Sequence, residues 1–374
     1  MKFRDLLFKL NCLSILGFGF CYASATQAAC VVSSGSPVTT TIPMNIGNIS
    51  AGSGMATGTV LARQTIHGYQ DVTVQCGVNS TFAGFRFEGG QLLSSTASGE
   101  IYETGIHNLG MRVKLYDGAF APKTYPGTLQ NADGSWASRI FLASGYLKVD
   151  LEFVKLGDIP AGGTINGSNL PRLIIYAASV SNPADRYTVA NYGFGGTVVY
   201  NTPTCATPNY QYNLGSHNVS VLPTNGSSTV WTATPITLTG CSIFYGNNSG
   251  DNSSASYKIT GSSSGTPTAN SLTKNYVNLD FLLPSGVESI PGTTGLISGD
   301  STSSAKNVGV QIGYDSNSTN TYVPVDLTLT TTIRPNIGGS GNLTFPFAAR
   351  LYRYGDQVVS GKINSSLIYV ISYQ

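Results

Sequence analysis

Short runs in which apolar and polar side chains alternate dominate the chain, and helical periodicity is almost absent. Because successive side chains of a strand point to opposite faces, a period of two predicts β-strands. Gly, Pro, Ser, Thr and Asn separate the runs, as is typical of all-β sandwiches. In the first half, strands are predicted at Gln70–Cys76, Gly110–Tyr116, Tyr146–Val154, Arg172–Ala177 and Gly196–Tyr200. In the second half, they are predicted at Gln211–Leu214, Pro235–Ser242, Tyr257–Thr260, Tyr276–Leu283, Asn307–Tyr314 and Leu343–Tyr354.

The run Tyr146–Val154 shows the alternation most clearly. One face carries the apolar side chains Leu147, Val149, Leu151 and Phe153, and the other carries Lys148, Asp150 and Glu152. This pattern predicts an antiparallel sheet with one face in water. We therefore expect Asp150 and Glu152 to be solvated surface residues.

The last run covers Gly361–Gln374. Its alternating apolar or small positions are Gly361, Ile363, Ser365, Leu367, Tyr369, Ile371 and Tyr373. Ile368 and Val370 make the other face partly apolar as well, which favours burial on both sides. No later segment of the sequence can cover this strand, so we expect it either to complete its own sheet or to accept a strand from another chain.

The N-terminal residues have the layout of a secretory signal peptide. Lys2, Arg4 and Lys9 precede an apolar run from Leu10 to Tyr22 and then small residues, which predicts a leader at 1–29 cleaved after Ala25, Ala28 or Ala29. The apolar run is shorter than the roughly 20 residues of a membrane span. We therefore expect an exported protein.

The charge of the chain without this leader is balanced, with 17 basic and 17 acidic residues. Such a chain has no basic field for nucleic acid or for an anionic membrane surface. Its polar surface must come from Ser, Thr, Asn and Gly.

Four of the six cysteines remain after the leader. Four cysteines allow three connectivities, and the wide gap in the sequence favours Cys30 with Cys76 and Cys205 with Cys241. Disulfides persist in an oxidising compartment. No Cys-x-x-Cys spacing is present and the three histidines are scattered, so neither a metal site nor a cofactor is predicted. His67 and His107, both in the first half, remain an alternative pair of metal ligands.

The length after cleavage, about 345 residues, suggests two domains. We place them at 30–200 and 205–374, with the segment 201–204 (NTPT) as a linker, because Pro203 favours an extended path. A Ser-, Gly- and Asn-rich stretch from Gly246 to Asn275 predicts long loops around one strand.

From Cys205 onward the chain resembles the pilin domain of the chaperone–usher fimbrial family. The matching pieces occur in family order and are Cys205, Asn213–Gly215, Pro235–Cys241, Ala305–Ile312, Ala349–Arg350, Gly361 and the penultimate Tyr373. The resemblance implies an immunoglobulin-like sandwich that lacks its last strand. A periplasmic chaperone, an outer-membrane usher and the next subunit as strand donor would be its partners. The implied strand interface is Gly361, Ile363, Leu367, Tyr369, Ile371 and Tyr373.

The first half resembles the receptor-binding domain of type 3 fimbrial adhesins. An early Cys30, a second cysteine that ends the segment Asp71–Cys76, and Gly110–Val113 carry this resemblance. The free N-terminal Phe of mannose-specific adhesins is missing, so mannose is not the expected ligand. No donor segment precedes Cys30 after cleavage, so we expect a subunit at the fimbrial tip on the cell surface.

Receptor-binding residues are expected in loops that combine aromatic and hydrogen-bonding side chains. The first candidate group is Asn131, Asp133, Trp136 and Arg139, although Trp136 could instead pack into its own core. The second group is Asp185, Arg186 and Tyr187, with Tyr192 nearby. A host glycan or a matrix protein is the expected ligand.

Catalysis has little support in the sequence: no His-Glu-x-x-His or phosphate-loop pattern is present. We therefore predict a non-enzymatic, all-β fimbrial tip adhesin. A structural pilin that only caps the fibre and a secreted carbohydrate-active enzyme are the alternatives.

Overall fold

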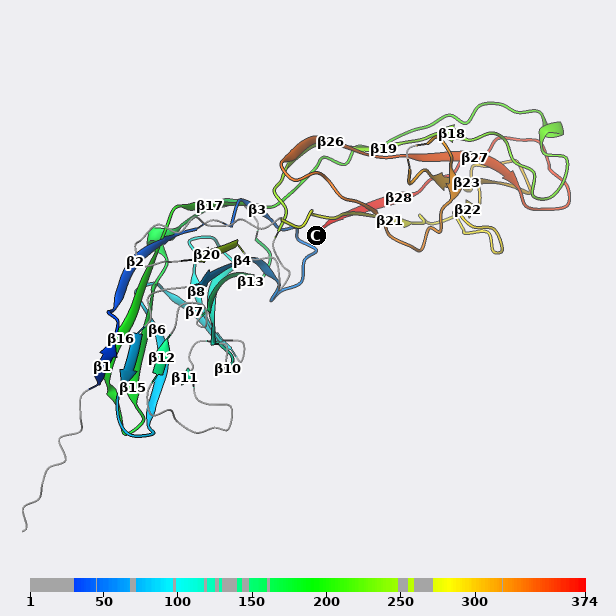
Figure 1. Cartoon of the computed structure of the whole chain (residues 1–374). Helices are drawn as coiled ribbons and strands as arrows, with labels where there is room; N and C mark the ends of the chain where they lie inside the picture. Colours follow the sequence, from blue (N-terminus) through cyan, green and yellow to red (C-terminus); the bar gives the residue numbers. More distant parts are fainter. Residues whose placement is uncertain are drawn as a thin grey trace, which may run out of the picture.

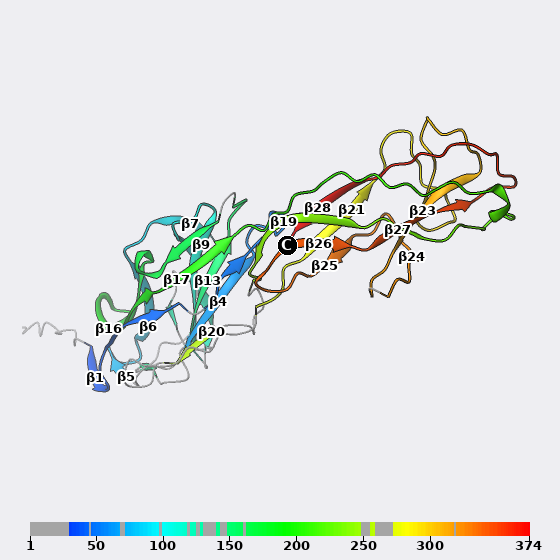
Figure 2. The same cartoon turned by 90° about the horizontal axis from the view of Figure 1, so that it is seen from above.

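The computed structural model describes residues 30–44, 46–67, 72–96, 99–117, 120–124, 128–129, 140–142, 148–159, 162–247, 255–258, 272–317 and 319–374. Figures 1 and 2 show two elongated β bodies joined end to end, with the C-terminal residue at their junction. These residues form strands and two short 3₁₀ helices, η1 (Gly167–Asn169) and η2 (Val219–Val221). Within the same residues, no helix has the length and apolar character needed to cross a bilayer.

The first body is built mainly from two large sheets. The larger has the order β20 (Ala255–Lys258), β4 (Val60–His67), β13 (Lys148–Lys155), β9 (Leu109–Asp117), β8 (Gly99–Glu103) and β7 (Leu92–Thr96), with β10 (Phe120–Thr124) also beside β9. The second has the order β11 (Thr128–Leu129), β6 (Thr81–Glu88), β15 (Arg172–Ser179), β16 (Asn182–Gly195) and β2 (Val38–Pro43). Two small sheets complete it: β1 (Val31–Ser34), β5 (Val72–Gln75) and β12 (Ile140–Leu142), and β14 (Gly163–Asn166), β17 (Thr197–Asn201) and β3 (Ile49–Ser50).

One core joins these sheets. The buried side chains include Ile42, Leu61, Val113, Phe153 and Tyr192, which come from β2, β4, β9, β13 and β16 and are all 0% exposed. The inward positions of the alternating strands therefore meet between the sheets, as expected for a sandwich.

The strand β20 belongs in sequence to the second half but pairs with the first. It lies parallel to β4, in a register that runs from Ala255 opposite Gln64 to Lys258 opposite His67. The chain therefore crosses between the two bodies more than once.

The second body has its own sandwich core. One sheet has the order β18 (Thr232–Ala233), β27 (Phe347–Arg353), β23 (Val308–Tyr314) and β22 (Leu296–Ile297), with β24 (Val323–Pro324) beside β23. Facing it are β19 (Ile236–Phe244) with β26 (Gly339–Phe345), and the group β25 (Thr331–Ile333), β21 (Val277–Leu282) and β28 (Ile368–Tyr373). Leu238, Leu279 and Phe345 are fully buried between them. The all-β fold of two sandwiches, with an incomplete second one, is thus as predicted.

The two disulfides join Cys30 to Cys76 and Cys205 to Cys241. These are the pairs that the sequence favours. Each bridge lies inside one body.

Several strand predictions need correction. Residues 211–214 form no strand. The run Leu343–Tyr354 is two strands that break at Pro346, because proline has no N–H for the ladder. The last strand covers only β28, and Ile368 and Val370 are 49% and 43% exposed, so its outer face is not buried.

Candidate functional site: an open strand edge and a charge cluster

The strand β28 is paired along one edge only. Its neighbour is β21, in an antiparallel register from Tyr373 opposite Val277 to Ile368 opposite Leu282. Just beyond the strand, Gln374 and Tyr276 exchange both of their backbone hydrogen bonds, at 2.8 and 2.7 Å. Because such pairs alternate along an antiparallel ladder, the N–H and C=O groups of Tyr369, Ile371 and Tyr373 point to the other edge. No strand of the described chain lies along that edge.

The inward side chains of this tail are only half-buried. They pack on the second core without being enclosed by it, and they are Ile363, Leu367, Tyr369, Ile371 and Tyr373. A final strand inside a finished sandwich would bury such side chains, as Leu279 on the neighbouring β21 is buried. The edge is therefore an apolar surface that another strand can cover.

Tyrosine hydroxyls tie β28 to the start of the second half. The hydroxyl of Tyr369 donates to the carbonyl of Pro208 at 2.5 Å, and the N–H of Cys205 donates to the hydroxyl of Tyr373 at 2.9 Å. Desolvation by burial raises the pKa of both hydroxyls, so they stay protonated at neutral pH. These bonds hold segment 205–208 close to the tail.

Three of the predicted interface residues precede β28 in the chain: Gly361, Ile363 and Leu367. Gly361 packs on Ser304 and Ala305, where a Cβ would come within 2.5 Å of the Ala305 nitrogen. The paired strand itself contains the other three predicted positions, Tyr369, Ile371 and Tyr373.

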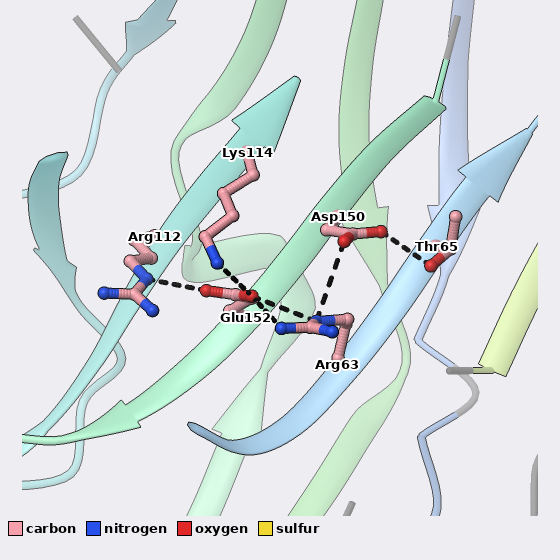
Figure 3. A network of polar contacts seen from close by, with 6 residues as sticks. All are labelled: Arg63, Thr65, Arg112, Lys114, Asp150 and Glu152. Carbon is pink, nitrogen blue, oxygen red and sulfur yellow. Dashed lines mark hydrogen bonds and ion pairs between the residues drawn. The ribbon is translucent and has the colours of Figure 1, made fainter. Parts of the chain in front are cut away.

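A buried charge cluster spans three strands of the larger first sheet. Figure 3 shows Glu152 of β13 between Arg63 of β4 and Arg112 of β9. One Glu152 oxygen accepts from Arg63 Nη2 at 2.5 Å and lies 3.2 Å from Lys114 Nζ. The other accepts from Arg112 Nε at 2.6 Å. Three cations therefore converge on a carboxylate that is 0% exposed.

Asp150 extends the cluster along β13. It lies 3.6 Å from Arg63 Nε and accepts a hydrogen bond from the hydroxyl of Thr65 at 2.6 Å. Asp150 is only 5% exposed. The prediction that Asp150 and Glu152 are solvated is wrong, since both face a covered, charged layer on the side of the sheet opposite the core.

The electrostatics of Glu152 favour its charged form. Burial by itself would raise the pKa of the carboxyl, but the hydrogen bond from Arg112 and the charges of Arg112, Lys114 and Arg63 outweigh it and lower the pKa. The carboxylate is saturated by these partners, so it cannot serve as a general acid. The cluster instead fastens β4, β13 and β9 to one another.

The first receptor candidates, Asn131, Asp133, Trp136 and Arg139, lie outside the described residues. The second group lies in β16, a strand, rather than in the predicted loop. Asp185 and Arg186 are exposed, Tyr187 is half-buried, and the neighbouring Tyr192 is a core residue with 0% exposure.

Arg186 forms part of a stack that the sequence did not reveal. Its guanidinium lies 4.6 Å from the centre of the Tyr176 ring, which also meets Phe82 edge to face at 6.3 Å. Gly84 makes room for this ring, because a Cβ there would lie 2.5 Å from Tyr176 Cζ. The stack lies near the β15–β16 hairpin, at the end of the first body away from the second (Figure 1).

Metal binding by His67 and His107 has no geometric support. His67 is opposite Lys148 at one end of β13, while His107 precedes Leu109, which is opposite Lys155 at the other end. Their backbones are therefore about 20 Å apart along the strand. Among the described side chains, no group of three or more His, Cys, Asp or Glu is placed to hold a metal.

Two family models match the chain: the MrkD-like receptor binding domain at residues 42–180 and the fimbrial protein at residues 192–374. Among solved structures, the CupB6 tip adhesin from Pseudomonas aeruginosa is 14% identical, covers 91% of this chain and 94% of its own, and has a TM-score of 0.34. The receptor binding domain of the adhesin MrkD1P of Klebsiella pneumoniae is 16% identical, covers 48% of this chain and 99% of its own, and has a TM-score of 0.32. No curated protein sequence matches.

The two models together match well over half of the chain, and both describe non-enzymatic kinds of protein. They agree with the two resemblances found in the sequence, one in each half. The chain therefore belongs to the chaperone–usher fimbrial adhesins, with an MrkD-like receptor-binding domain followed by a fimbrial domain.

Proposed function

We propose that this protein is a fimbrial tip adhesin that is exported through the periplasm and built into a surface pilus by donor-strand complementation. The observation that carries the proposal is the unpaired edge of β28 with its half-buried apolar side chains. A periplasmic chaperone would cover this edge first and the next fimbrial subunit would cover it in the fibre, after transfer at the outer-membrane usher. Residues 205–374 would be the pilin domain, 30–200 the receptor-binding domain and 201–204 the linker.

The end of the first body away from the second is the best place for receptor contact. It carries Asp185 and Arg186 on the surface, and the arginine is held by the Tyr176 ring and by a hydrogen bond to the Pro183 carbonyl at 3.1 Å. A pre-positioned guanidinium can recognise the hydroxyls of a glycan or the carbonyls of a matrix protein. We place the receptor site here, with Tyr187 as a further contributor. The other sequence-based candidates, Asn131, Asp133, Trp136 and Arg139, lie outside the described residues and are proposed from the sequence alone.

Replacing Arg186 by alanine tests this site. We expect attachment of fimbriated cells to glycan- or matrix-protein-coated surfaces to fall about tenfold, the loss of one charge-assisted contact. Arg334→Ala is the matched control, because Arg334 also stacks on a tyrosine, Tyr276, at 4.5 Å, but in the second body. Equal attachment by the two variants would remove Arg186 from the site.

A fibre cap without receptor binding is the second candidate, since the open β28 edge serves either role. Deleting residues 30–200 separates the two. A tip adhesin then loses attachment while electron microscopy still shows fibres that contain the remaining chain, whereas for a cap attachment is unchanged.

A further inference from the structure

The row of backbone N–H and C=O groups along the open edge of β28 ends where this strand meets the first body. Of the three residues that point to this edge, Tyr373 already has a partner for its carbonyl oxygen, the N–H of Gly54, at 3.1 Å. Gly54 lies in the first half of the chain, and the C-terminal residue lies at the junction of the two bodies (Figure 1). The last acceptor that an added strand would use is thus occupied from within the molecule.

The loop 52–55 is packed directly against the end of β28. A Cβ at Gly52 would overlap the backbone carbonyl of Tyr373, and a Cβ at Gly54 would lie 3.1 Å from its oxygen. Glycine at position 52 is therefore what permits the two backbones to approach so closely. An added strand and this loop cannot occupy the same place.

Lys155 holds the loop from the first-body side. Its side chain is 2% exposed, and its ammonium group donates to the carbonyls of Gly52, Ser53 and Met55 at 3.1, 2.9 and 2.6 Å. All three of its N–H donors are thereby used. The loop conformation is fixed by a charged group at the end of β13, which itself lies in the sheet of the first body.

Two buried polar residues fasten the start of the loop to the second body. The Ser50 N–H donates to the Gly246 carbonyl at 2.7 Å, and Asn275 Nδ2 donates to the Ser50 carbonyl at 3.1 Å. The same Asn275 amide also reaches the backbone oxygen of Gln374 at 3.4 Å. Ser50 and Asn275 are 0% and 1% exposed, so these bonds are sheltered from water.

We propose that loop 52–55 is an end stop for the donated strand. The partner is an extended segment of another fimbrial subunit with alternating apolar side chains. Its backbone pairs with Tyr369 and Ile371 and stops before Tyr373, because Gly54 holds that position. The receptor-binding half of the chain thus sets the register of a strand that binds to the other half. This inference rests on the proposed acceptance of a strand by β28.

Amide hydrogen exchange of the full chain tests the end stop. The probe is a 12-residue peptide of alternating valine and threonine with terminal lysines. We expect the peptide to slow exchange of the Tyr369 and Ile371 N–H groups at least tenfold and to leave the N–H of Tyr373 unchanged. Gly54→Pro lacks the N–H donor, and Lys155→Met releases the loop. In both variants we expect the peptide to slow exchange of the Tyr373 N–H group as well.

Gly54→Ala is the matched control, because it keeps the N–H group. Its Cβ would lie 3.1 Å from the Tyr373 oxygen, which a shift of a few tenths of an ångström relieves, so this variant should show the parent pattern. Slowed exchange at Tyr373 in the parent, or the parent pattern in both Gly54→Pro and Lys155→Met, would overturn the end stop. Should Gly54→Pro fail to fold, Lys155→Met and the parent pattern still decide. No slowing at any of the three amides would instead overturn strand acceptance itself, and the end stop with it.

Discussion

Replacing Glu152 by glutamine is expected to lower the free energy of unfolding of the first body by about 3–5 kcal/mol, the usual cost of removing one partner from a buried ion pair. The carboxylate is 0% exposed and is the common partner of Arg63, Arg112 and Lys114. Glutamine keeps the shape but leaves these cations without the charge that they surround. Chemical denaturation followed by tryptophan fluorescence or circular dichroism measures the change.

Glu88→Gln is the matched control for this experiment. Glu88 pairs with Arg86 at 2.6 Å in the same body, but the two side chains are 46% and 40% exposed. Exposed pairs contribute only about 0–1 kcal/mol, so this variant should unfold nearly like the parent. A similar effect of both substitutions would show that burial of the cluster is not what makes Glu152 important.

The effect of Glu152 should depend on pH in a definite direction. Because its pKa is lowered in the folded chain, the stabilisation is present above the pKa of an unfolded glutamate, about 4.3, and is lost as the pH falls through the lower folded value. The stability difference between parent and Glu152→Gln is therefore constant near pH 7 and shrinks below about pH 4. A difference that grows on acidification would contradict the pKa direction.

Replacing Ile371 by aspartate is expected to abolish strand acceptance and to reduce the amount of this chain in fibres at least tenfold. The side chain of Ile371 lies half-buried against the second core on the open strand, so an added strand would enclose a charge without a partner. Immunoblots of sheared fimbriae and of the periplasm measure the result. We expect loss from the fimbrial fraction and degradation in the periplasm.

Val370→Asp provides the control on the same strand. Val370 is 43% exposed on the opposite face, so a charge there stays in water. This variant should assemble like the parent. Failure of both variants would point to a general intolerance of charge in β28 rather than to a covered inner face.

Alternation along the chain was enough to predict strands that carry the core, because inward apolar positions recur at every second residue on β9 and β13. The same rule failed at Asp150 and Glu152. A period of two identifies a polar face of a strand, but it cannot tell whether that face contacts water or other charged side chains. The cations that surround Glu152 come from β4 and β9, some 40 to 90 residues earlier in the sequence. Only the strand order brings them together.

The candidate sites were predictable to different degrees. The inner face of β28 followed from the alternation of its sequence, because Tyr369, Ile371 and Tyr373 pack on the second core. The receptor candidates did not, because the sequence predicts a loop at Asp185 and Arg186, whereas Asn182–Gly195 is one long strand. Its N-terminal part includes Pro183 and carries several exposed residues, which conceals a strand that becomes buried only from Val189 onward.

The parallel pairing of β20 with β4 means that the first sandwich is not a continuous piece of sequence. A fragment that ends near residue 200 would lack residues 255–258, so β4 would become an unpaired edge strand that a neighbouring molecule can reach. Such fragments can self-associate through a surface that the intact molecule keeps covered. Binding measured with such fragments would then combine recognition of the ligand with non-specific association through the exposed edge of β4.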